Sequence, residues 1–382
     1  MNWVNRTQAT CTGRLSVADI TLMRFSLGGE SAHPRYNRCG GGACMNSLSH
    51  LDGNKLDPVL ITYNRAKELE RTLDVFIAAG LTTIKMHILD NASTDNTPHI
   101  VALAQLKWPN LTYHRNAYNI GGNANILRAL EVSNSEYSWI IGDDDAWLLD
   151  SLDELLTVIQ DGKADVVRLG WLVAPDNRGK LLQATEIVES EKFFFASLSM
   201  ISATIIRRCI ITPTLPYGYM AIPDAYPQLV SILKSITRCQ LLIYTMSTDL
   251  MIHTPSSSPG YYLGDLEWCS SWFRMSRFID DNIIRRKFVG EAAGYLSRDT
   301  PGAVREFLIL VKIVVKFKAW GITQWPYLLS MLAYGLGWRF RTISLLIINM
   351  ITPKAMAIIT TKIYYCITRQ KEIDLHFDRS RI

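Results

Sequence analysis

The sequence of 382 residues lacks the glycine-rich fingerprint that marks a dinucleotide-binding strand and helix. Its first β-type run, residues 59–63, continues into the letters TYNRAKE, which contain no glycine. A Rossmann dehydrogenase is therefore disfavoured. A nucleotidyltransferase on a similar α/β scaffold stays open as an alternative, although it would need a glycine-rich loop at this point to hold a triphosphate.

Cysteine is sparse and shows no metal-site spacing. The seven cysteines are an odd number, and Cys39 and Cys44 in CGGGAC have no second pair at a suitable distance along the chain. We interpret them as free thiols in a reducing compartment, and a small zinc site is disfavoured. The first residues lack the apolar stretch of a secretory signal. Residues 1–54 hold seven glycines without periodicity, and we expect a disordered or irregular extension there.

Acidic residues are nearly absent from the last part of the chain. Between Arg305 and Lys371 there are ten Lys and Arg residues and one acid, Glu306, whereas the whole chain has a net charge of only +5. No nucleic-acid-binding motif accompanies this segment, so nucleic acid is not expected as a partner. An anionic membrane surface is the partner that basic residues between apolar runs indicate.

One long uncharged run, residues 319–338, has the length of a bilayer crossing. Gly321, Pro326 and Gly335 weaken a spanning helix within it. We therefore expect residues 305–371 to lie in the membrane interface, at the cytoplasmic face of the inner or plasma membrane, as a peripheral or monotopic attachment. A buried helical cap on the remaining protein is the alternative.

Strand-like and helix-like segments alternate between residues 58 and 145. Each of four short apolar runs is followed by polar residues, and helical spacing separates the runs. This alternation predicts a parallel α/β sheet with right-handed crossovers. The polar groups fall where the strands end, at 62–64, 90–91 and 143–145. Because ligands bind beyond the carboxyl ends of parallel strands, these groups are expected to meet in one crevice.

The stretch WIIGDDD, residues 139–145, combines a short buried strand, a glycine and three adjacent carboxylates. Adjacent acids repel one another unless a cation offsets their charge. Mg²⁺ or Mn²⁺ commonly takes one or two carboxylates together with substrate phosphates. The pattern thus favours a metal-bridged diphosphate at the end of this strand. The alternative is an acidic turn that caps the helix beginning near Leu148.

Four segments together resemble the family 2 glycosyltransferases of the GT-A fold, of the bacterial surface-polysaccharide type. They are PVLITYNR (58–65), ILDNASTDNT (88–97), NIGGNANILRAL (119–130) and WIIGDDD (139–145). The resemblance covers about residues 57–255. It implies an NDP-sugar donor, UDP-sugar foremost, and Mn²⁺ or Mg²⁺ as cofactor.

The resemblance also implies roles for individual residues. Thr62 and Tyr63 would line the base pocket, Asp90 would accept a hydrogen bond from the base, and Asn91 stands where the family usually has a second acid. The implied nucleotide-sugar-binding residues are Thr62, Tyr63, Asn64, Arg65, Asp90, Asn91, Asp143 and Asp144. The implied metal ligands are Asp143, Asp145 and His253, although a lone His in a polar loop is also often structural.

A catalytic base is expected at Asp224. Inverting transfer needs a carboxylate to take the proton of the acceptor hydroxyl. Relatives carry a Glu-Asp pair near this place, and here Pro223 replaces the Glu. The alternative for Asp224 is a helix cap, and Asp249 and Asp265 are weaker candidates for the base.

The resemblance implies a metal-dependent, inverting transfer from an NDP-sugar to a hydroxyl of a lipid-linked glycan, in O-antigen or capsule assembly. A non-catalytic membrane-bound protein that binds glycan or nucleotide is a further alternative. The expected fold is a mostly parallel sheet flanked by helices, with a C-terminal helical, membrane-associated segment. The expected divisions are an extension (1–54), a GT-A catalytic domain (55–255), an acceptor-side helical region (256–304) and basic amphipathic helices (305–382).

Overall fold

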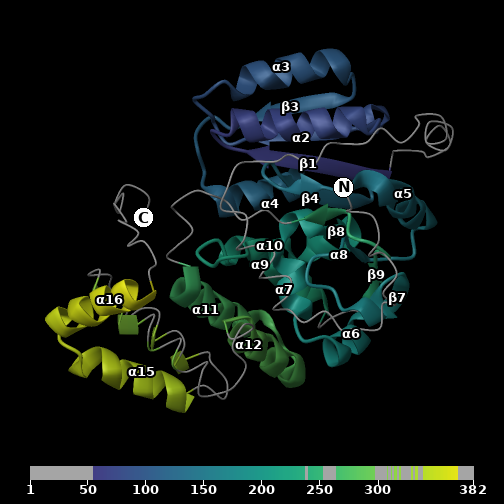
Figure 1. Ribbon diagram of the computed structural model, residues 1–382. Helices are drawn as coiled ribbons and strands as arrows, with labels where there is room; N and C mark the ends of the chain where they lie inside the picture. Colours follow the sequence, from purple (N-terminus) through teal and green to yellow (C-terminus); the bar gives the residue numbers. More distant parts are fainter. Residues whose placement is uncertain are drawn as a thin grey trace, which may run out of the picture.

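The computed structural model describes residues 55–236, 240–252, 264–296 and 339–368, with single helical positions between 308 and 333. The expected extension at 1–54 lies outside the described residues. An eight-stranded sheet runs through the centre in the order β3-β2-β1-β4-β8-β6-β9-β7 (Figure 1). The expected divisions of the chain stay predictions.

The first half of the sheet is the parallel α/β unit that the alternating sequence pattern predicts. Strands β1, β2, β3 and β4 pair only in parallel with one another. The elements are β1 (Leu56–Thr62), α2 (Ala66–Ala78), β2 (Met86–Asp90), α3 (Thr97–Lys107), β3 (Leu111–Arg115), α4 (Gly122–Val132) and β4 (Tyr137–Gly142). The prediction of four parallel strands with helical crossovers is confirmed.

The second half makes the sheet mixed. Strand β8 (Thr204–Arg207) lies antiparallel between β4 and β6 (Val166–Arg168). Strand β9 (Leu242–Thr245) runs parallel to β6, and β7 (Lys180–Gln183) closes the edge antiparallel to β9. The expectation of a mostly parallel sheet therefore holds for the first half of the sheet, β1 to β4, and not for the second half.

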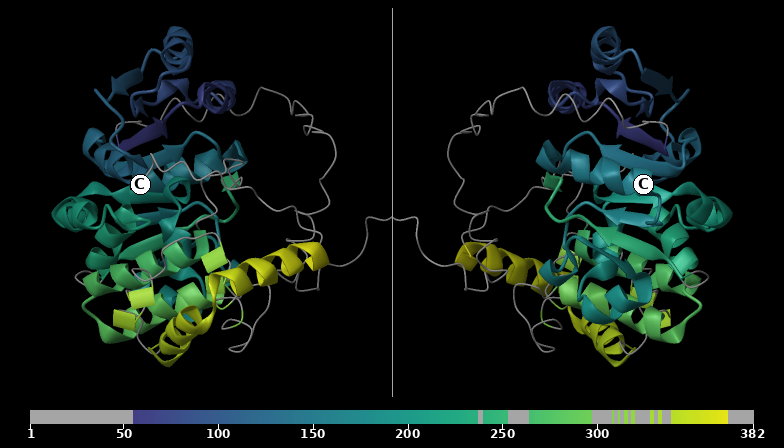
Figure 2. Two further views of the ribbon diagram at one scale, coloured as in Figure 1. Left: turned by 90° about the vertical axis from the view of Figure 1, so that its left-hand side faces the viewer. Right: turned by 90° about the vertical axis from the view of Figure 1, so that its right-hand side faces the viewer.

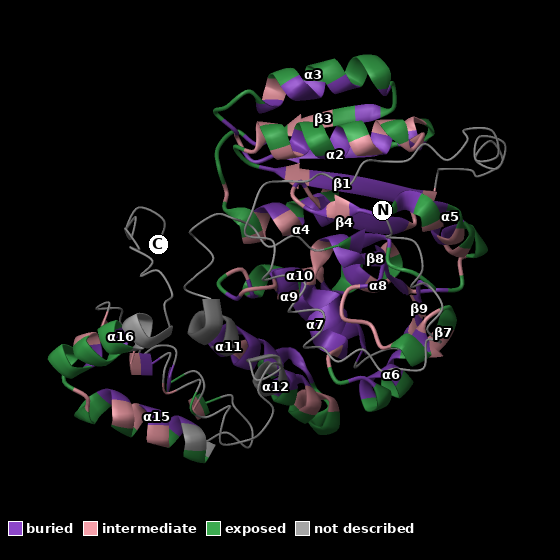
Figure 3. Ribbon diagram, in the orientation of Figure 1, coloured by how far each residue is buried: buried purple, intermediate pink, exposed green. Residues whose placement is uncertain are grey.

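Helices cover both faces of the sheet. Neighbouring residues of a strand point to opposite faces, so Val59 belongs to one buried cluster and Leu60 to the other. Side chains of α2, α3 and α5 pack in the cluster of Leu60, and those of α4, α7 and α10 in the cluster of Val59. Figure 3 shows the strands buried between these layers. The remaining helices are α5 (Leu152–Asp161), α6 (Ala184–Ser190), α7 (Phe194–Ser199), α8 (Arg208–Ile211), α9 (Leu215–Met220), α10 (Pro227–Ile236), α11 (Gly264–Met275), α12 (Asn282–Leu296), α15 (Arg339–Ile351) and α16 (Lys354–Thr368).

The last two helices lie at the end of the molecule remote from α3, beyond α11 and α12 (Figures 1 and 2). Among the described helices, none alone has the length and apolar character of a membrane span. Taken together, Thr342–Ile351 and Lys354–Ile363 have the length and composition of a span, but the pair is bent by 104°. The expected membrane association of this region stays a prediction.

Candidate active site

The polar groups at three strand ends meet at one edge of the sheet, as the sequence predicts. Thr62 at the end of β1 is in register with Asp90 at the end of β2. On the other side of β1, Ile61 is in register with Gly142, the last residue of β4. The Thr62 hydroxyl donates to Asp143 Oδ2 at 2.6 Å, across 81 residues of chain. The acids of 143–145 and Asp90 thus flank Thr62 from opposite sides.

Asp143 is a buried carboxylate of the acidic triplet, with 4% of its surface exposed. Its Oδ1 accepts a hydrogen bond from Arg65 at 3.1 Å, and the Thr72 hydroxyl donates to its backbone carbonyl at 3.0 Å. Burial raises the pKa of Asp143 to about 6, while the Thr62 hydrogen bond and the Arg65 charge act in the opposite direction. These contacts therefore hold the Asp143 side chain in a fixed orientation beside the end of β1.

Arg65 joins two of the acids. One of its terminal nitrogens lies 3.1 Å from Asp143 Oδ1 and 2.5 Å from Asp144 Oδ2. Burial lowers the pKa of the guanidinium, but the two carboxylates more than offset this and raise it. Arg65 thus carries a permanent positive charge at the place where the sequence suggests a diphosphate.

The turn after β1 is fixed by Asn64, which has a positive φ of 53° that Asn tolerates better than most residues. Its backbone N–H donates to Ser93 Oγ at 2.9 Å, and its side-chain oxygen accepts from the Thr94 N–H at 2.7 Å. Asn64 therefore ties the loop after β1 to the loop after β2. Its neighbour Tyr63 is 40% exposed, so that ring is accessible to a ligand.

Asp90 is fully buried and accepts hydrogen bonds from three protein donors. The Ser93 N–H lies 2.8 Å from Oδ1, while the Tyr113 hydroxyl and Arg115 Nε lie 2.6 and 3.3 Å from Oδ2. A carboxylate accepts about four hydrogen bonds, so these donors leave one acceptor position of Asp90 unused. Sequence reasoning missed Tyr113 and Arg115, although their spacing of two residues at the end of a strand puts them on one face.

Asn91 organises the loop before α4. Its Nδ2 donates to Asn119 Oδ1 at 2.7 Å, and its Oδ1 accepts from Asn116 Nδ2 at 2.9 Å and from the Ile120 N–H at 3.0 Å. An amide can donate and accept in this way, whereas a carboxylate could only accept. This explains why an amide suits the position where the family usually has an acid.

The same loop reaches Asp224, the expected base. Asn123 Nδ2, in the first turn of α4, donates to the backbone carbonyls of Ile222 and Asp224 at 2.9 and 2.7 Å. Because α4 begins at the carboxyl edge of the sheet, this contact puts the Asp224 segment on the active-site side.

The Asp224 carboxylate is 1% exposed and is held by two arginines. Arg274 Nε, from α11, donates to Oδ1 at 2.6 Å, and Arg277 lies 3.6 Å from Oδ2. In the described part of the chain, buried Oδ2 has no hydrogen-bond partner. No sequence pattern points to Arg274, which lies 50 residues further along the chain. The alternative candidate Asp249 instead pairs with Arg178 at 2.5 Å.

The acidic triplet could supply part of the ligands of a metal ion, with phosphate oxygens of a substrate supplying the rest. With its described neighbours, it does not form a site in which the protein supplies every ligand. In the ranges the structure describes, no three His, Cys, Asp or Glu side chains are grouped as metal ligands. However, a Cβ built on Gly142 would meet Asp145 Oδ2 at 3.3 Å and Asp144 Oδ1 at 3.4 Å, so two carboxylate oxygens converge over this glycine. Mg²⁺ and Mn²⁺ accept such a partial set when substrate oxygens complete it. Asp143 differs, since each of its oxygens already accepts a hydrogen bond.

His253 lies outside the described residues. The residue before it, Ile252, is in register with Ala146, which directly follows Asp145. This pairing joins β5 (Ala146–Trp147) and β10 (Met251–Ile252) into a two-stranded sheet. The role of His253 as a metal ligand stays a prediction.

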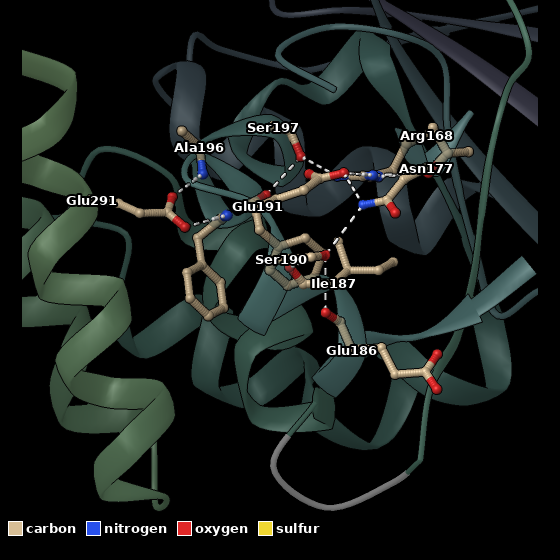
Figure 4. Close-up of polar contacts among 12 residues, drawn as sticks. Arg168, Asn177, Glu186, Ile187, Ser190, Glu191, Ala196, Ser197 and Glu291 are labelled. Carbon is tan, nitrogen blue, oxygen red and sulfur yellow. Dashed lines mark hydrogen bonds and ion pairs between the residues drawn. The ribbon is translucent and has the colours of Figure 1, made fainter. Parts of the chain in front are cut away.

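A second buried polar cluster fixes the helices beside the antiparallel half (Figure 4). Arg168, 1% exposed at the end of β6, makes two hydrogen bonds to Glu191 at 2.6 and 2.7 Å. It also donates to Thr245 Oγ1 at 2.8 Å and to Ser197 Oγ at 3.1 Å, and Asn177 donates to Glu191 at 2.6 Å. This cluster holds α6 and α7 on the sheet.

Glu291 of α12 reaches the start of α7 beside this cluster. Its two carboxylate oxygens accept the backbone N–H groups of Phe195 and Ala196 at 3.1 and 2.9 Å. Burial raises the pKa of Glu291 to about 8, the two N–H groups oppose the rise, and nearby Glu191 adds to it. Glu291 thus connects the acceptor-side helix α12 to the sheet through hydrogen bonds.

A large central α/β sheet with acids and amides gathered at the carboxyl ends of its parallel strands is the arrangement of the GT-A fold. Residues 59–214 match the model of the family described as Glycosyl transferase family 2. Abequosyltransferase RfbV of Salmonella typhimurium strain LT2 is 36% identical over 112 residues. That alignment covers 28% of this chain and 32% of the relative, so it spans about a third of the relative's length.

The architecture is also found among solved structures. The crystal structure of S. aureus TarS 1-349, in complex with UDP-GlcNAc, has a TM-score of 0.50 and 13% sequence identity, and the superposition covers 81% of this chain and 92% of that chain. At this identity the likeness establishes the fold, which agrees with the GT-A fold expected from the sequence.

Proposed function

We propose that the protein is a metal-dependent, inverting glycosyltransferase that moves a sugar from an NDP-sugar, UDP-sugar foremost, to a hydroxyl of a lipid-linked glycan. O-antigen or capsule assembly is the setting we propose. The observation that carries this proposal is the meeting of Thr62, Asp90 and Asp143 at neighbouring carboxyl ends of β1, β2 and β4. The similarity to an abequosyltransferase supports a role in surface polysaccharide assembly.

The donor would bind across this edge. Tyr63 and Thr62 would line the pocket of the base, and Asp90 would accept a hydrogen bond from it at its remaining acceptor position. Asp143, which Thr62 and Arg65 hold in place, would lie near the ribose. The Arg65 guanidinium, partly exposed beside Asp144, offers a charge-assisted hydrogen bond to the diphosphate.

Asp144 and Asp145 would hold Mn²⁺ or Mg²⁺, and Asp143 lies beside them with its two oxygens engaged by Thr62 and Arg65. When bound, such an ion stabilises the negative charge of the departing diphosphate. The protein contributes two convergent carboxylate oxygens over Gly142, where the lack of a side chain leaves room. Arg65 limits the repulsion among the acids in the absence of other cations.

Asp224 would act as the base. The acceptor oxygen forms a bond to the anomeric carbon as the bond from that carbon to the diphosphate breaks, and the acceptor proton passes to Asp224 Oδ2. This oxygen is the one that Arg274 leaves without a hydrogen bond. Because the carboxylate is 1% exposed, we expect α11 to shift when the acceptor binds.

The test is transfer by the full chain to lipid-linked glycans, with a panel of labelled NDP-sugars, with and without Mn²⁺. We expect one donor to give a labelled product in the presence of the metal, and Asp143→Asn to lower the rate by about a hundredfold or more. Asp161→Asn, at an exposed position at the end of α5, is the matched control and should keep full activity. Release of pyrophosphate from a nucleoside triphosphate, with no transfer from any NDP-sugar, would instead identify a nucleotidyltransferase.

A further inference from the structure

Helix α15 carries two distinct faces. Thr342, Leu345 and Asn349 recur at spacings of three and four residues and are buried against the protein. The residues on the opposite side of the helix are large, apolar and exposed, with exposed fractions of 82% (Phe340), 45% (Ile343), 51% (Ile347), 67% (Met350) and 70% (Ile351). At 3.6 residues per turn these five side chains form one continuous stripe.

Helix α16 repeats this arrangement. Ala357 and Thr361 are buried, whereas Met356, Ile359 and Ile363 are exposed by 60%, 57% and 53% on the other side. The two helices meet at Thr352 and Pro353 with a bend of 104°. Figure 3 shows extensive exposed and half-buried surface on both helices. We call the exposed apolar side chains of α15 and α16 together the docking face.

Single exposed apolar residues are normal on soluble proteins, but a continuous stripe on two consecutive helices marks a surface with a partner. The charge around the docking face indicates which partner. Lys354 and Lys362 of α16 are exposed, and the segment from Arg305 to Lys371 has ten basic residues and one acid. Anionic lipid headgroups complement this charge, whereas the equally basic face of a second copy would repel it.

We infer that the docking face inserts into the interface of an anionic lipid bilayer, with α15 and α16 lying in the membrane plane. Only one side of each helix can enter the membrane. On the other side, Leu345 in α15 and Ala357 in α16 are fully buried against the protein. A pair of helices crossing the bilayer would instead present apolar residues to lipid on most of its circumference. This inference does not depend on the chemistry proposed for the donor site.

The docking face is connected to the proposed acceptor side. Leu345 belongs to the same buried cluster as Trp272 and Phe273 of α11, the helix whose Arg274 holds Asp224. Docking of α15 and α16 on a membrane would therefore bring the part of the protein that contains Asp224 close to the membrane surface. Figure 1 shows α11 and α12 between the sheet and the last two helices.

The test is flotation of the full chain with vesicles of phosphatidylglycerol and phosphatidylcholine, compared with vesicles of phosphatidylcholine alone. We expect binding to the anionic vesicles, and a loss of about tenfold or more in the double variant Ile347→Glu with Met356→Glu. Leu106→Glu on α3 is the matched control, because Leu106 is 81% exposed at the remote end of the molecule. The milder double variant Met350→Gln with Ile359→Gln should give a smaller loss of binding. It keeps the test decisive if the first double variant does not fold.

Three results would overturn the inference. The first is no binding of the wild-type protein to anionic vesicles. The second is a loss of binding in Leu106→Glu as large as that in the docking-face variants. The third is self-association in lipid-free solution that Ile347→Glu abolishes. Binding of UDP, measured on the same variants, should stay unchanged, so that failure of membrane docking and failure of the donor site are distinguished.

Discussion

Replacement of Arg274 by Met tests how the acceptor-side helix α11 is coupled to Asp224. The Asp224 carboxylate is 1% exposed, and Arg274 Nε is its hydrogen-bond donor at 2.6 Å. Arg274 is itself fixed by hydrogen bonds to Ser270 and Ser271 on the same helix. Met keeps the length of the side chain and removes the charge and the donors. Among the cationic side chains in the described ranges, the variant leaves Arg277 near this buried carboxylate, at 3.6 Å.

The expected cost follows from this geometry. Removal of one partner of a buried ion pair destabilises a protein by about 3–5 kcal/mol. Since 20% of the Arg274 side chain is exposed, we expect the lower end, about 3 kcal/mol. Asp224→Asn should cost less, about 1–2 kcal/mol, because Arg274 can turn toward water. The double variant should cost less than the sum of the single variants, with a coupling energy of about 2 kcal/mol.

Urea unfolding of wild type, both single variants and the double variant measures this coupling. Arg286→Met on α12 is the matched control, since that side chain is exposed and should change stability by no more than about 0.5 kcal/mol. In the transfer assay, Arg274→Met should lower kcat more than it raises the KM of the donor, and Arg274→Lys should restore part of kcat. A coupling energy below about 0.5 kcal/mol would refute the assignment of Arg274 as the residue that positions Asp224.

Three further predictions concern other parts of the molecule. Arg65→Met removes the guanidinium that pairs with Asp143 and Asp144, and should weaken UDP binding about tenfold or more by calorimetry. Burial raises the pKa of Glu291 from 4.5 to about 8, so the folded state retains a proton that the unfolded chain loses. Its contribution, a few kcal/mol, is therefore fully present below pH 4.5, falls as the pH rises, and is lost once the pH reaches about 8, and Glu291→Gln should flatten the fall of the melting temperature between roughly pH 4.5 and 8. Gly170, with φ of +124°, would carry a Cβ 2.1 Å from Asp249 Oδ1 and 2.8 Å from its Cα, so Gly170→Ala should cost more than about 3 kcal/mol in urea unfolding, and an unchanged midpoint would contradict this.

The donor half could be predicted from the sequence because its information is local. Apolar runs and helical spacing define the elements of residues 58–145, and parallel strands bring their carboxyl ends to one edge. That rule alone joins Thr62, Asp90 and Asp143. The antiparallel place of β8 between β4 and β6 could not be predicted, because an apolar strand carries no local sign of which neighbour it will pair with.

The contacts that fix the acceptor half depend on residues far apart in sequence. The Arg274–Asp224 pair spans 50 residues, and the hydrogen bond from Ala196 to Glu291 spans 95. A buried carboxylate and an exposed one look the same in a sequence, since only the fold determines which of them loses its water. Asn91 is a related case, because its value as a donor and acceptor becomes evident only once the loop before α4 lies beside it.

The central claim is that the acids that follow β4 hold one cation, and that this cation binds the diphosphate of a nucleotide lying across the ends of β1 and β2. Calorimetric titration of the full chain with UDP, with and without Mn²⁺, tests it most directly when wild type is compared with Asp145→Ala. We expect tight binding to wild type only with Mn²⁺, and the loss of this metal dependence in Asp145→Ala. Equal affinity of the wild type with and without Mn²⁺, or a metal dependence that survives in Asp145→Ala, would contradict the account.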